Sequence, residues 1–416
     1  MRQLFHVASN FLFMVFVLKT VSILGSTGSV GKNTLEVISK LPDQFNVYAI
    51  SCNENTSLLH DQIIKYKPSV AVITNYEKYN EFLNEHGNEI GITRILFGDE
   101  GLNEISSNNG IDIVVIAIVG FQCLKPTVNA IRTNKTVIIA NKEILVAAGE
   151  MLMSILSKSD AKLLPVDSEH NALLQVILSS GLEYKVNNKE YYESNINNLT
   201  ITASGGPFID LNISEFKNIK PKHAIKHPTW DMGEKISVDS STMMNKGLEI
   251  IEAKLLFNLN LDKINAIIHR QSRVHALVEF FDGTIIAHMS DPDMKIPISY
   301  ALTFPHRVYK SASSKFIYNN LTFEDIPISK FPCYKLARSV AETGKNSGLI
   351  LNAANEISVE YFLKDKIMYI DIPNIIDEVL NSVEVSSKDN IESVLDNDKE
   401  VRMITKKLIK EKYGAS

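Results

Sequence analysis

The chain has 416 residues, more than one ordinary hydrophobic core accommodates, so two or three domains are expected. Hydrophobic residues make up 45% and charged residues 22% of the sequence, as in typical globular proteins, and the net charge of −5 gives no electrostatic reason to bind nucleic acid. The three cysteines, Cys52, Cys123 and Cys333, are too far apart for a CxxC metal motif or a disulfide framework, which fits a reducing compartment. We expect each to be a small buried apolar side chain.

The N-terminus carries Arg2 and His6 and then an unbroken apolar run over residues 11–18. The run is far shorter than the roughly 20 residues of a membrane span, so no stable span is expected. It resembles the apolar core of a secretory signal, and we expect residues 1–20 to be a targeting segment. An extra strand of the mature protein and a mis-assigned gene start are the alternatives. With the Asn-, Lys- and Ile-rich insertions, the run favours a plastid-like organelle such as an apicoplast, and a cytoplasmic location is the alternative.

From residue 21 to residue 162, short β-branched runs alternate with helical stretches. This alternation predicts an α/β fold with a Rossmann-like, doubly wound parallel sheet that has helices on both faces. Strands are expected at residues 21–24, 47–51, 71–73, 113–118 and 137–140, and helices at residues 33–39, 58–66, 127–132 and 149–158.

The pattern changes near residue 163, and a central α/β catalytic domain is expected over residues 163–310. Within it, residues 183–198 are polar and Asn-rich and predict a surface insertion. Strands are expected at residues 199–203, 264–269, 275–281 and 284–288, the last two joined by a hairpin turn at Asp282-Gly283. Residues 311–330 are expected to be a linker. A small C-terminal helical bundle is predicted over residues 331–416, with helices at residues 334–343, 353–363, 372–381 and 391–410.

A glycine-rich loop follows the first predicted strand and opens a helix. Its spacing is G-x-x-G-x-x-G, and in this position glycines let backbone N–H groups approach a pyrophosphate. A purely structural turn is the alternative. Asn53, Glu54 and Asn55 follow the second strand, where an acidic residue at the strand tip would favour NADH; this loop leaves the choice between NADH and NADPH open.

Two acidic clusters are the strongest chemical signal. Asp167 and Glu169 are two positions apart, so in an extended segment they would share a face. Glu249 is expected on a helix that starts near residues 241–242, with Lys246 on the same face. If the three carboxylates converge, they would bind a hard divalent cation. The alternatives are a solvated acidic pair and an ordinary surface ion pair.

Several blocks of the chain resemble the 1-deoxy-D-xylulose 5-phosphate reductoisomerase family of the non-mevalonate isoprenoid pathway. The resemblance covers about residues 21–372, in particular residues 25–31, 141–143, 164–171, 204–208, 227–232, 238–249 and 351–357. It implies conversion of a small phosphorylated sugar, 1-deoxy-D-xylulose 5-phosphate, to 2-C-methyl-D-erythritol 4-phosphate. It also implies NADPH, a divalent cation (Mg²⁺, Mn²⁺ or Co²⁺) and a homodimer.

The resemblance implies roles for the matching residues. Residues expected at the cofactor are Gly25, Ser26, Thr27, Gly28, Ser29, Val30, Asn53, Asn55, Asn141, Lys142, Glu143, Met232 and Gly233. The metal ligands would be Asp167, Glu169 and Glu249, which with Lys142 and His227 form the catalytic set. The substrate would meet Ser168, Ser204, His227, Trp230, Ser240, Asn245 and Lys246. Residues 226–234 would form a flap that closes over the substrate and excludes water.

The sequence also departs from the family pattern. Arg270 and Arg273 replace apolar or proline positions, Cys123 follows bulky residues where small ones are usual, and Glu54 stands where some members have a basic residue. The general base stays open between Lys142, His227 and a metal-bound water. Two other functions remain: an NAD(P) dehydrogenase of the semialdehyde or homoserine type without rearrangement, and a non-catalytic NADPH-binding protein.

Overall fold

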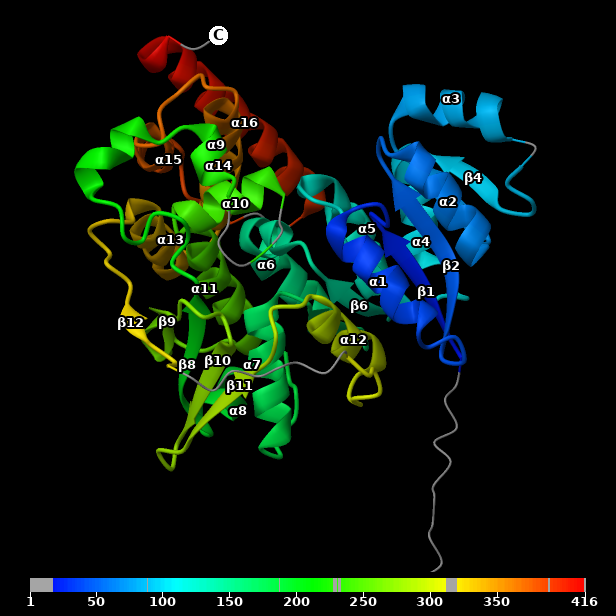
Figure 1. The fold of residues 1–416 in the computed structure, drawn as a ribbon, viewed down its shortest axis with the longest axis horizontal. Coiled ribbons are helices and arrows are strands. Elements are labelled where there is room, and N and C mark those ends of the chain that lie inside the picture. Colours follow the sequence, from blue (N-terminus) through cyan, green and yellow to red (C-terminus); the bar gives the residue numbers. More distant parts are fainter. Residues whose placement is uncertain are drawn as a thin grey trace, which may run out of the picture.

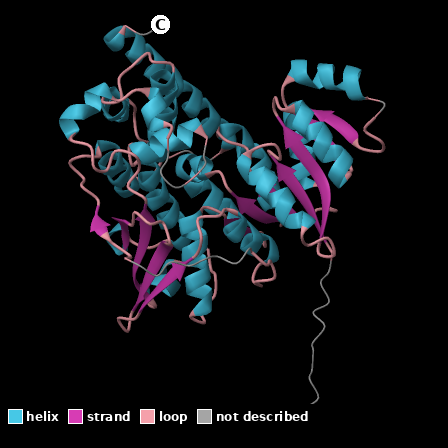
Figure 2. Ribbon diagram, viewed as in Figure 1, coloured by secondary structure: helices cyan, strands magenta, loops and turns pink. Residues whose placement is uncertain are grey.

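The computed structural model describes residues 18–87, 89–186, 188–226, 230, 233–311, 320–387 and 390–414. Residues 1–17 of the expected targeting segment therefore lie outside the described residues, whereas residues 19 and 20 begin the first strand. Figure 1 traces the elements in chain order, and Figure 2 separates helices from strands.

The first sheet has seven strands, all paired in parallel, in the order β4-β3-β2-β1-β5-β6-β7. The strand order reverses between β1 and β5, which makes this a doubly wound sheet and confirms the predicted α/β class. The strands are β1 (Lys19–Leu24), β2 (Phe45–Cys52), β3 (Val70–Ile73), β4 (Arg94–Phe97), β5 (Ile113–Ile116), β6 (Thr136–Ile139) and β7 (Lys162–Pro165).

Helices connect these strands, as Figure 1 shows in blue to teal. They are α1 (Ser29–Ser39), α2 (Thr56–Tyr66), α3 (Tyr76–His86), α4 (Gly98–Ser107), the short η1 (Phe121–Cys123), α5 (Leu124–Arg132) and α6 (Lys142–Leu156). The sequence pattern did not predict β4, α3 or α4. Strand β4 is an edge strand with no buried residue, and α3 buries only Phe82, so neither has a clear apolar pattern. The helix predicted from residue 149 begins seven residues earlier, at Lys142. The sheet extends to Pro165, so the boundary predicted after residue 162 falls inside β7.

The second sheet is mixed, in the order β11-β10-β8-β9-β12. Its strands are β8 (Ile196–Ala203), β9 (Ile264–Ile268), β10 (Val274–Phe280), β11 (Ile285–Met289) and β12 (Glu324–Asp325). Because β12 pairs with β9, the predicted linker contributes an edge strand to this sheet. The predicted surface insertion is also wrong in part, since it holds α8 (Lys189–Glu193), whose Tyr192 is fully buried, and the start of β8.

The remaining helices pack against the second sheet and against one another. They are α7 (Ser168–Ser179), η2 (Ile213–Asn218), α9 (Pro221–Ala224), α10 (Glu234–Ser241), α11 (Met244–Phe257), η3 (Leu261–Lys263), α12 (Lys295–Thr303), α13 (Pro332–Thr343), α14 (Ser347–Leu363), α15 (Asp371–Ser382) and α16 (Ile391–Tyr413). Helix α14 packs on α6 and α10, and α13 packs on α11, so the C-terminal helices support the centre of the molecule. One apolar cluster runs through most of these helices and both sheets, and a second joins α12 to the first sheet, α1 and α2.

The structure bears on the predictions made for the cysteines and for a membrane span. Cys52, Cys123 and Cys333 are buried and unpaired, as predicted. Among the described residues, no helix is long and apolar enough to cross a membrane.

The glycine loop is held by close backbone contacts. Gly25 has φ +91°, a conformation that favours glycine, and a Cβ there would lie 2.7 Å from the carbonyl oxygen of Ala117. A Cβ on Gly31 would overlap the carbonyl oxygen of Gly25 and lie 2.5 Å from the Cα of Ser26. Gly28 has ordinary room, since its nearest contact would be 3.5 Å.

We therefore expect Gly31→Ala to lower the melting temperature by a few degrees, because overpacking a tight contact costs about 1–3 kcal/mol. Gly28→Ala is the matched control and should melt like the wild type. Differential scanning calorimetry of both variants makes the comparison, and equal melting temperatures would contradict the packing described for Gly31.

Candidate functional site

A cavity of about 200 Å³ opens where the carboxyl ends of the first sheet meet α7, α10 and α11. Ligands commonly bind at this edge of open α/β sheets. Most of the predicted metal and substrate residues line it, together with part of the glycine loop. The predicted residues in its lining are Ser29, Val30, Lys142, Asp167, Ser168, Glu169, Ser204, Trp230, Gly233, Ser240, Asn245, Lys246 and Glu249.

The three predicted metal ligands converge in this cavity. Asp167 precedes α7 as its N-cap residue, Glu169 lies in the first turn of that helix, and Glu249 projects from α11. One carboxylate oxygen from each lies within 4.8 Å of the others. The N-terminal end of a helix favours negative charge, which suits the first two carboxylates. A hard divalent cation with oxygen ligands fits this set.

Two details of the predicted geometry were wrong. Asp167 and Glu169 do not share an extended segment, because α7 begins at Ser168. The helix that carries Glu249 begins at Met244 and not near residue 241, because Met243 adopts a left-handed conformation with φ +61° and separates α10 from α11. The carboxylates meet because a strand end and two helix turns aim them at one point.

Two lysine ammonium groups contact the carboxylates. Lys142 Nζ contacts the carboxylate of Asp167 and lies 3.0 Å from Glu249 Oε1. Lys246 Nζ lies 2.8 Å from Glu169 Oε1 and also contacts Glu249. The side chains of Lys246 and Glu249 are only 4% and 2% exposed, so the surface ion-pair alternative is wrong. When all three carboxylates are ionised, they carry one more charge than the two ammonium groups balance, and a further cation would stabilise that state.

The same environment sets the protonation of these groups. Burial opposes the ionisation of Asp167, but the charge of Lys142 outweighs it and holds the pKa of that carboxyl well below its usual range. Burial and the neighbouring charge of Glu249 raise the pKa of Glu169 to about 7. Burial disfavours the charged form of Lys142, yet Asp167 and Glu249 keep the pKa of its ammonium well above the ordinary value.

A buried histidine lies behind the carboxylates. His170 donates through Nε2 to the backbone oxygen of Glu249 at 2.9 Å, and its Nδ1 lies 3.7 Å from Asp167 Oδ1 and 3.5 Å from Glu252 Oε2. Burial opposes its protonation, but the carboxylates of Glu252 and Asp167 raise the pKa of His170 to about 9. His170 thus links the two elements that carry the carboxylates. The sequence analysis gave no role to His170 or Glu252; their i,i+3 spacing from Asp167 and Glu249 was the available signal.

The predicted phosphate residues line the same cavity, and two of them, Asn245 and Lys246, contact the carboxylates directly. Gly206 has φ +67°, and a Cβ there would lie 2.8 Å from the carbonyl oxygen of Ser240. This close approach brings the loop of Ser204 against the end of α10. The backbone N–H of Gly206 donates to Ser204 Oγ at 3.2 Å, and the amide of Asn245 donates to Glu249.

Several predicted cofactor residues make contacts that maintain the fold. Ser26 Oγ donates to Gln62 at 2.6 Å, and Asn55 caps the N-terminus of α2. Asn53 accepts from the hydroxyl of Thr74, and Asn141 donates to the backbone oxygens of residues 118 and 120. These contacts position the loops around the mouth of the sheet. The residues of the cofactor set that do not line the cavity are Gly25, Ser26, Thr27, Gly28, Asn53, Asn55, Asn141 and Glu143, and their cofactor role stays a prediction.

The predicted flap is described only in part, since His227 and Met232 lie outside the described residues. Trp230 lines the cavity, and its ring centroid is 6.3 Å from that of His275. Gly233 caps α10.

A buried ion pair follows the flap directly in the chain. Lys235 Nζ lies 2.8 Å from Glu143 Oε1 on α6 and 2.9 Å from Asp239 Oδ2 on α10. Asn355 on α14 donates to Asp239 at 2.8 Å. Lys235 therefore ties α10 to α6, and Asp239 extends the link to α14, contacts that no sequence pattern predicted.

Comparisons with known proteins agree with this site. Three family models match the chain: 1-deoxy-D-xylulose 5-phosphate reductoisomerase over residues 21–149, the C-terminal domain of that enzyme over residues 163–257, and the DXP reductoisomerase C-terminal domain over residues 289–404. A curated 1-deoxy-D-xylulose 5-phosphate reductoisomerase of Clostridium perfringens is 42% identical over 399 residues, 95% of this chain and all of the relative. The chain belongs to the 1-deoxy-D-xylulose 5-phosphate reductoisomerase family.

Other relatives support the same membership. The reductoisomerase of Chloroherpeton thalassium is 42% identical over 387 residues, which is 92% of this chain and 97% of that one. A solved structure of the reductoisomerase from Zymomonas mobilis in complex with NADPH has a TM-score of 0.85 at 35% identity, and covers 94% of this chain and 99% of its own. A reductoisomerase in complex with NADPH, fosmidomycin and magnesium has a TM-score of 0.85 at 36% identity, and covers 94% of this chain and 98% of its own.

The departures from the family pattern are accommodated by local contacts. Arg270 forms ion pairs with Asp210 at 2.7 Å and Glu324 at 2.8 Å, and Arg273 contacts Asp291. Cys123 lies beside the amide of Asn141 at 3.1 Å. None of these contacts reaches the three converging carboxylates.

We expect Lys235→Met to destabilise the protein by about 3–5 kcal/mol, because it leaves Glu143 and Asp239 buried without their cation. Lys217→Met, at an exposed lysine of η2, is the control and should change the free energy of unfolding by less than about 0.5 kcal/mol. Urea unfolding measures both. Equal stabilities of the two variants would show that Lys235 does not carry the ion-pair network.

Proposed function

We propose that the chain is an NADPH-dependent reductoisomerase that converts 1-deoxy-D-xylulose 5-phosphate to 2-C-methyl-D-erythritol 4-phosphate with the help of a divalent cation. Family membership supports this function, and relatives in solved structures carry NADPH and magnesium. The observation that carries the proposal is the convergence of three carboxylates and two lysines at the carboxyl edge of a parallel sheet. A simple dehydrogenase without rearrangement requires no such trio.

Asp167, Glu169 and Glu249 would hold the cation. The fit rests on the oxygen donors, their separation of less than 4.8 Å and the negative charge that the three ionised carboxylates leave beside Lys142 and Lys246. A bound cation supplies Lewis-acid stabilisation of charge on substrate oxygens, and NADPH supplies the hydride. His170 holds Asp167 and the backbone of Glu249 in place and so orients the ligands.

Lys142 places a positive charge beside the proposed metal ligands. Its ammonium lies 3.1 Å from Asn245 Oδ1 and contacts two carboxylates, and its pKa is raised well above the ordinary value against the effect of burial. A group that stays charged at neutral pH does not accept a proton. We therefore assign Lys142 to orienting and stabilising a negatively charged oxygen, which leaves His227 and a bound water as candidates for the base.

The predicted phosphate residues in the cavity would hold the substrate phosphate. Ser204, Ser240 and Asn245 offer neutral donors, and Lys246 adds a charge that lies between this group and the carboxylates. Binding the phosphate there uses remote binding energy to position the reacting carbons. Trp230 and the flap would exclude water from the cavity.

Two finer assignments stay proposals. A homodimer is expected from the resemblance to the family. The plastid-like destination rests on the N-terminal apolar run and the Asn-, Lys- and Ile-rich insertions, and the relatives reported above are bacterial and give it no support.

We expect Asp167→Asn and Glu249→Gln each to lower kcat/KM for 1-deoxy-D-xylulose 5-phosphate by at least ~100-fold, the effect that loss of one metal-orienting group can have. The measurement is NADPH oxidation with Mg²⁺ or Mn²⁺, on protein lacking residues 1–17, because β1 begins at Lys19. Glu183→Gln is the matched control, because Glu183 is 73% exposed and pairs only at the surface with Lys185; it should keep full activity.

Chelation separates the proposal from the dehydrogenase alternative. Activity on this substrate should disappear with EDTA and return with Mn²⁺. Turnover that survives complete chelation, or near-normal turnover in Asp167→Asn or Glu249→Gln, would rule out the metal assignment.

A further inference from the structure

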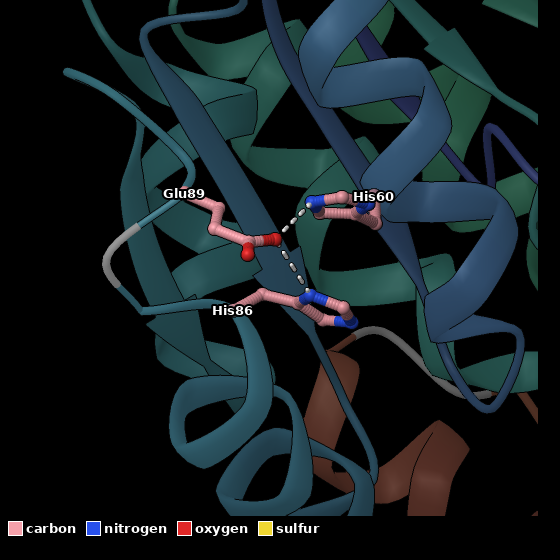
Figure 3. A group of neighbouring side chains, drawn as sticks. All are labelled: His60, His86 and Glu89. Carbon is pink, nitrogen blue, oxygen red and sulfur yellow. Dashed lines mark hydrogen bonds and ion pairs between the residues drawn. The ribbon is translucent and has the colours of Figure 1, made fainter.

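A second group of metal-ligand side chains lies on the first domain, away from the cavity. His60 projects from α2, His86 ends α3, and Glu89 lies in the connection from α3 to β4 (Figure 3). None of the three lines the cavity that holds the catalytic residues. The group belongs to neither the proposed mechanism nor the ion pairs that support it.

The separations of the three donor atoms suit a metal ion better than a hydrogen bond. Glu89 Oε2 lies 3.7 Å from His60 Nε2 and 3.5 Å from His86 Nδ1, and all three donor atoms lie within 4.8 Å of one another. A good hydrogen bond would bring such atoms to about 2.7–3.2 Å. Ligands at about 2.0–2.1 Å from a tetrahedral Zn²⁺ ion are about 3.3–3.5 Å apart, close to the separations observed.

Burial gives a second, independent indication of a ligand. The side chain of His60 is 19% exposed, and its Nε2 is buried without a hydrogen-bond partner among the described residues. Buried nitrogen atoms are normally satisfied, so an orphan aimed at a carboxylate and a second imidazole requires a partner. The buried ring of Phe82 packs beside both histidines and limits the access of solvent to the group from the protein interior.

A further carboxylate lies beside the second histidine. Glu85 Oε2 lies 3.8 Å from His86 Nε2, the nitrogen that faces away from Glu89. This separation is too long for a hydrogen bond, but the negative charge of Glu85 favours a cation nearby. The two imidazole rings are stacked, with centroids 4.1 Å apart and planes 20° apart. Because an ion lies in the plane of each imidazole that binds it, the rings must tilt apart on binding.

We propose that His60, His86 and Glu89 form a binding site for a divalent transition-metal ion, with Zn²⁺ as the best match. Two imidazole nitrogens and one carboxylate select Zn²⁺ and its neighbours over Mg²⁺, which prefers oxygen ligands alone. The site therefore differs in chemistry from the three carboxylates of the cavity. A water molecule would complete the tetrahedron.

The ion would join α2 to the end of α3 and its connection to β4, where the rings of His60, Phe82 and His86 already pack together. Helix α2 begins at Thr56, directly after the predicted cofactor residues Asn53 and Asn55, and its Gln62 bonds with both the hydroxyl and the backbone oxygen of Ser26 in the glycine loop. A link from His60 to the α3–β4 connection would fix α2 from its outer side. The expected role is structural support of the first domain.

Isothermal titration calorimetry with Zn²⁺ tests the proposal, using metal-stripped protein in excess Mg²⁺ so that the carboxylate site is occupied. We expect one Zn²⁺ per chain in the wild type. His60→Gln, His86→Gln and Glu89→Gln should each weaken this binding by at least tenfold and abolish the rise in melting temperature that Zn²⁺ causes. His306→Gln, at an exposed histidine outside the group, and Asp167→Asn should retain both effects.

Co²⁺ in place of Zn²⁺ gives a direct readout of the ligands, since tetrahedral Co²⁺ with nitrogen ligands absorbs strongly in the visible range. The absorption should appear in the wild type and in Asp167→Asn and be absent in His86→Gln. Absence of Zn²⁺ binding in excess Mg²⁺, or binding that His86→Gln and Glu89→Gln leave unchanged, would overturn the proposal. If His60→Gln fails to fold, the other two variants decide, because His86 and Glu89 are more exposed.

Discussion

Three buried carboxylates meet two lysine ammonium groups at one point, and the chemistry of the molecule depends on this balance of charge. Asp167, Glu169 and Glu249 would repel one another in a dry cavity without Lys142 and Lys246. The lysines keep the cluster stable, and a further cation would stabilise its fully ionised state. The opposite pKa shifts of Asp167 and Glu169 follow from the same balance: burial raises both pKa values, Lys142 outweighs burial at Asp167, and Glu249 adds to burial at Glu169 more than Lys246 offsets.

The secondary-structure elements are arranged around this cluster of carboxylates and lysines. The parallel sheet delivers Asp167 at the end of β7, the N-terminal turn of α7 adds Glu169, and α11 brings Glu249 from the far side. Buried polar links then hold the helices in register. His170 spans α7 and α11, and Lys235 spans α6 and α10. The C-terminal helices complete the enclosure, since α14 packs on both α6 and α10.

The sequence predicted the chemistry of the site better than its local geometry. The short β-branched runs and the glycine loop were enough to predict the doubly wound sheet, because buried parallel strands have a distinct composition. Strand β4 and helix α3 bury almost no residues, so the sequence pattern did not predict them. The acidic motifs predicted carboxylates that the structure does bring together, but the helix start at Ser168 and the break at Met243 depend on packing. Tertiary links such as Lys235–Glu143 join residues 92 positions apart and leave no local pattern.

Crystals of the enzyme with Mn²⁺ would test the central account most directly, because anomalous scattering locates the ion without assumptions about its ligands. The account predicts a single strong peak in the cavity, with carboxylate oxygens of Asp167, Glu169 and Glu249 in its coordination shell and the ammonium groups of Lys142 and Lys246 moved aside. A cavity that holds no ion, or an ion there that leaves any of the three carboxylates paired with lysine alone, would contradict it.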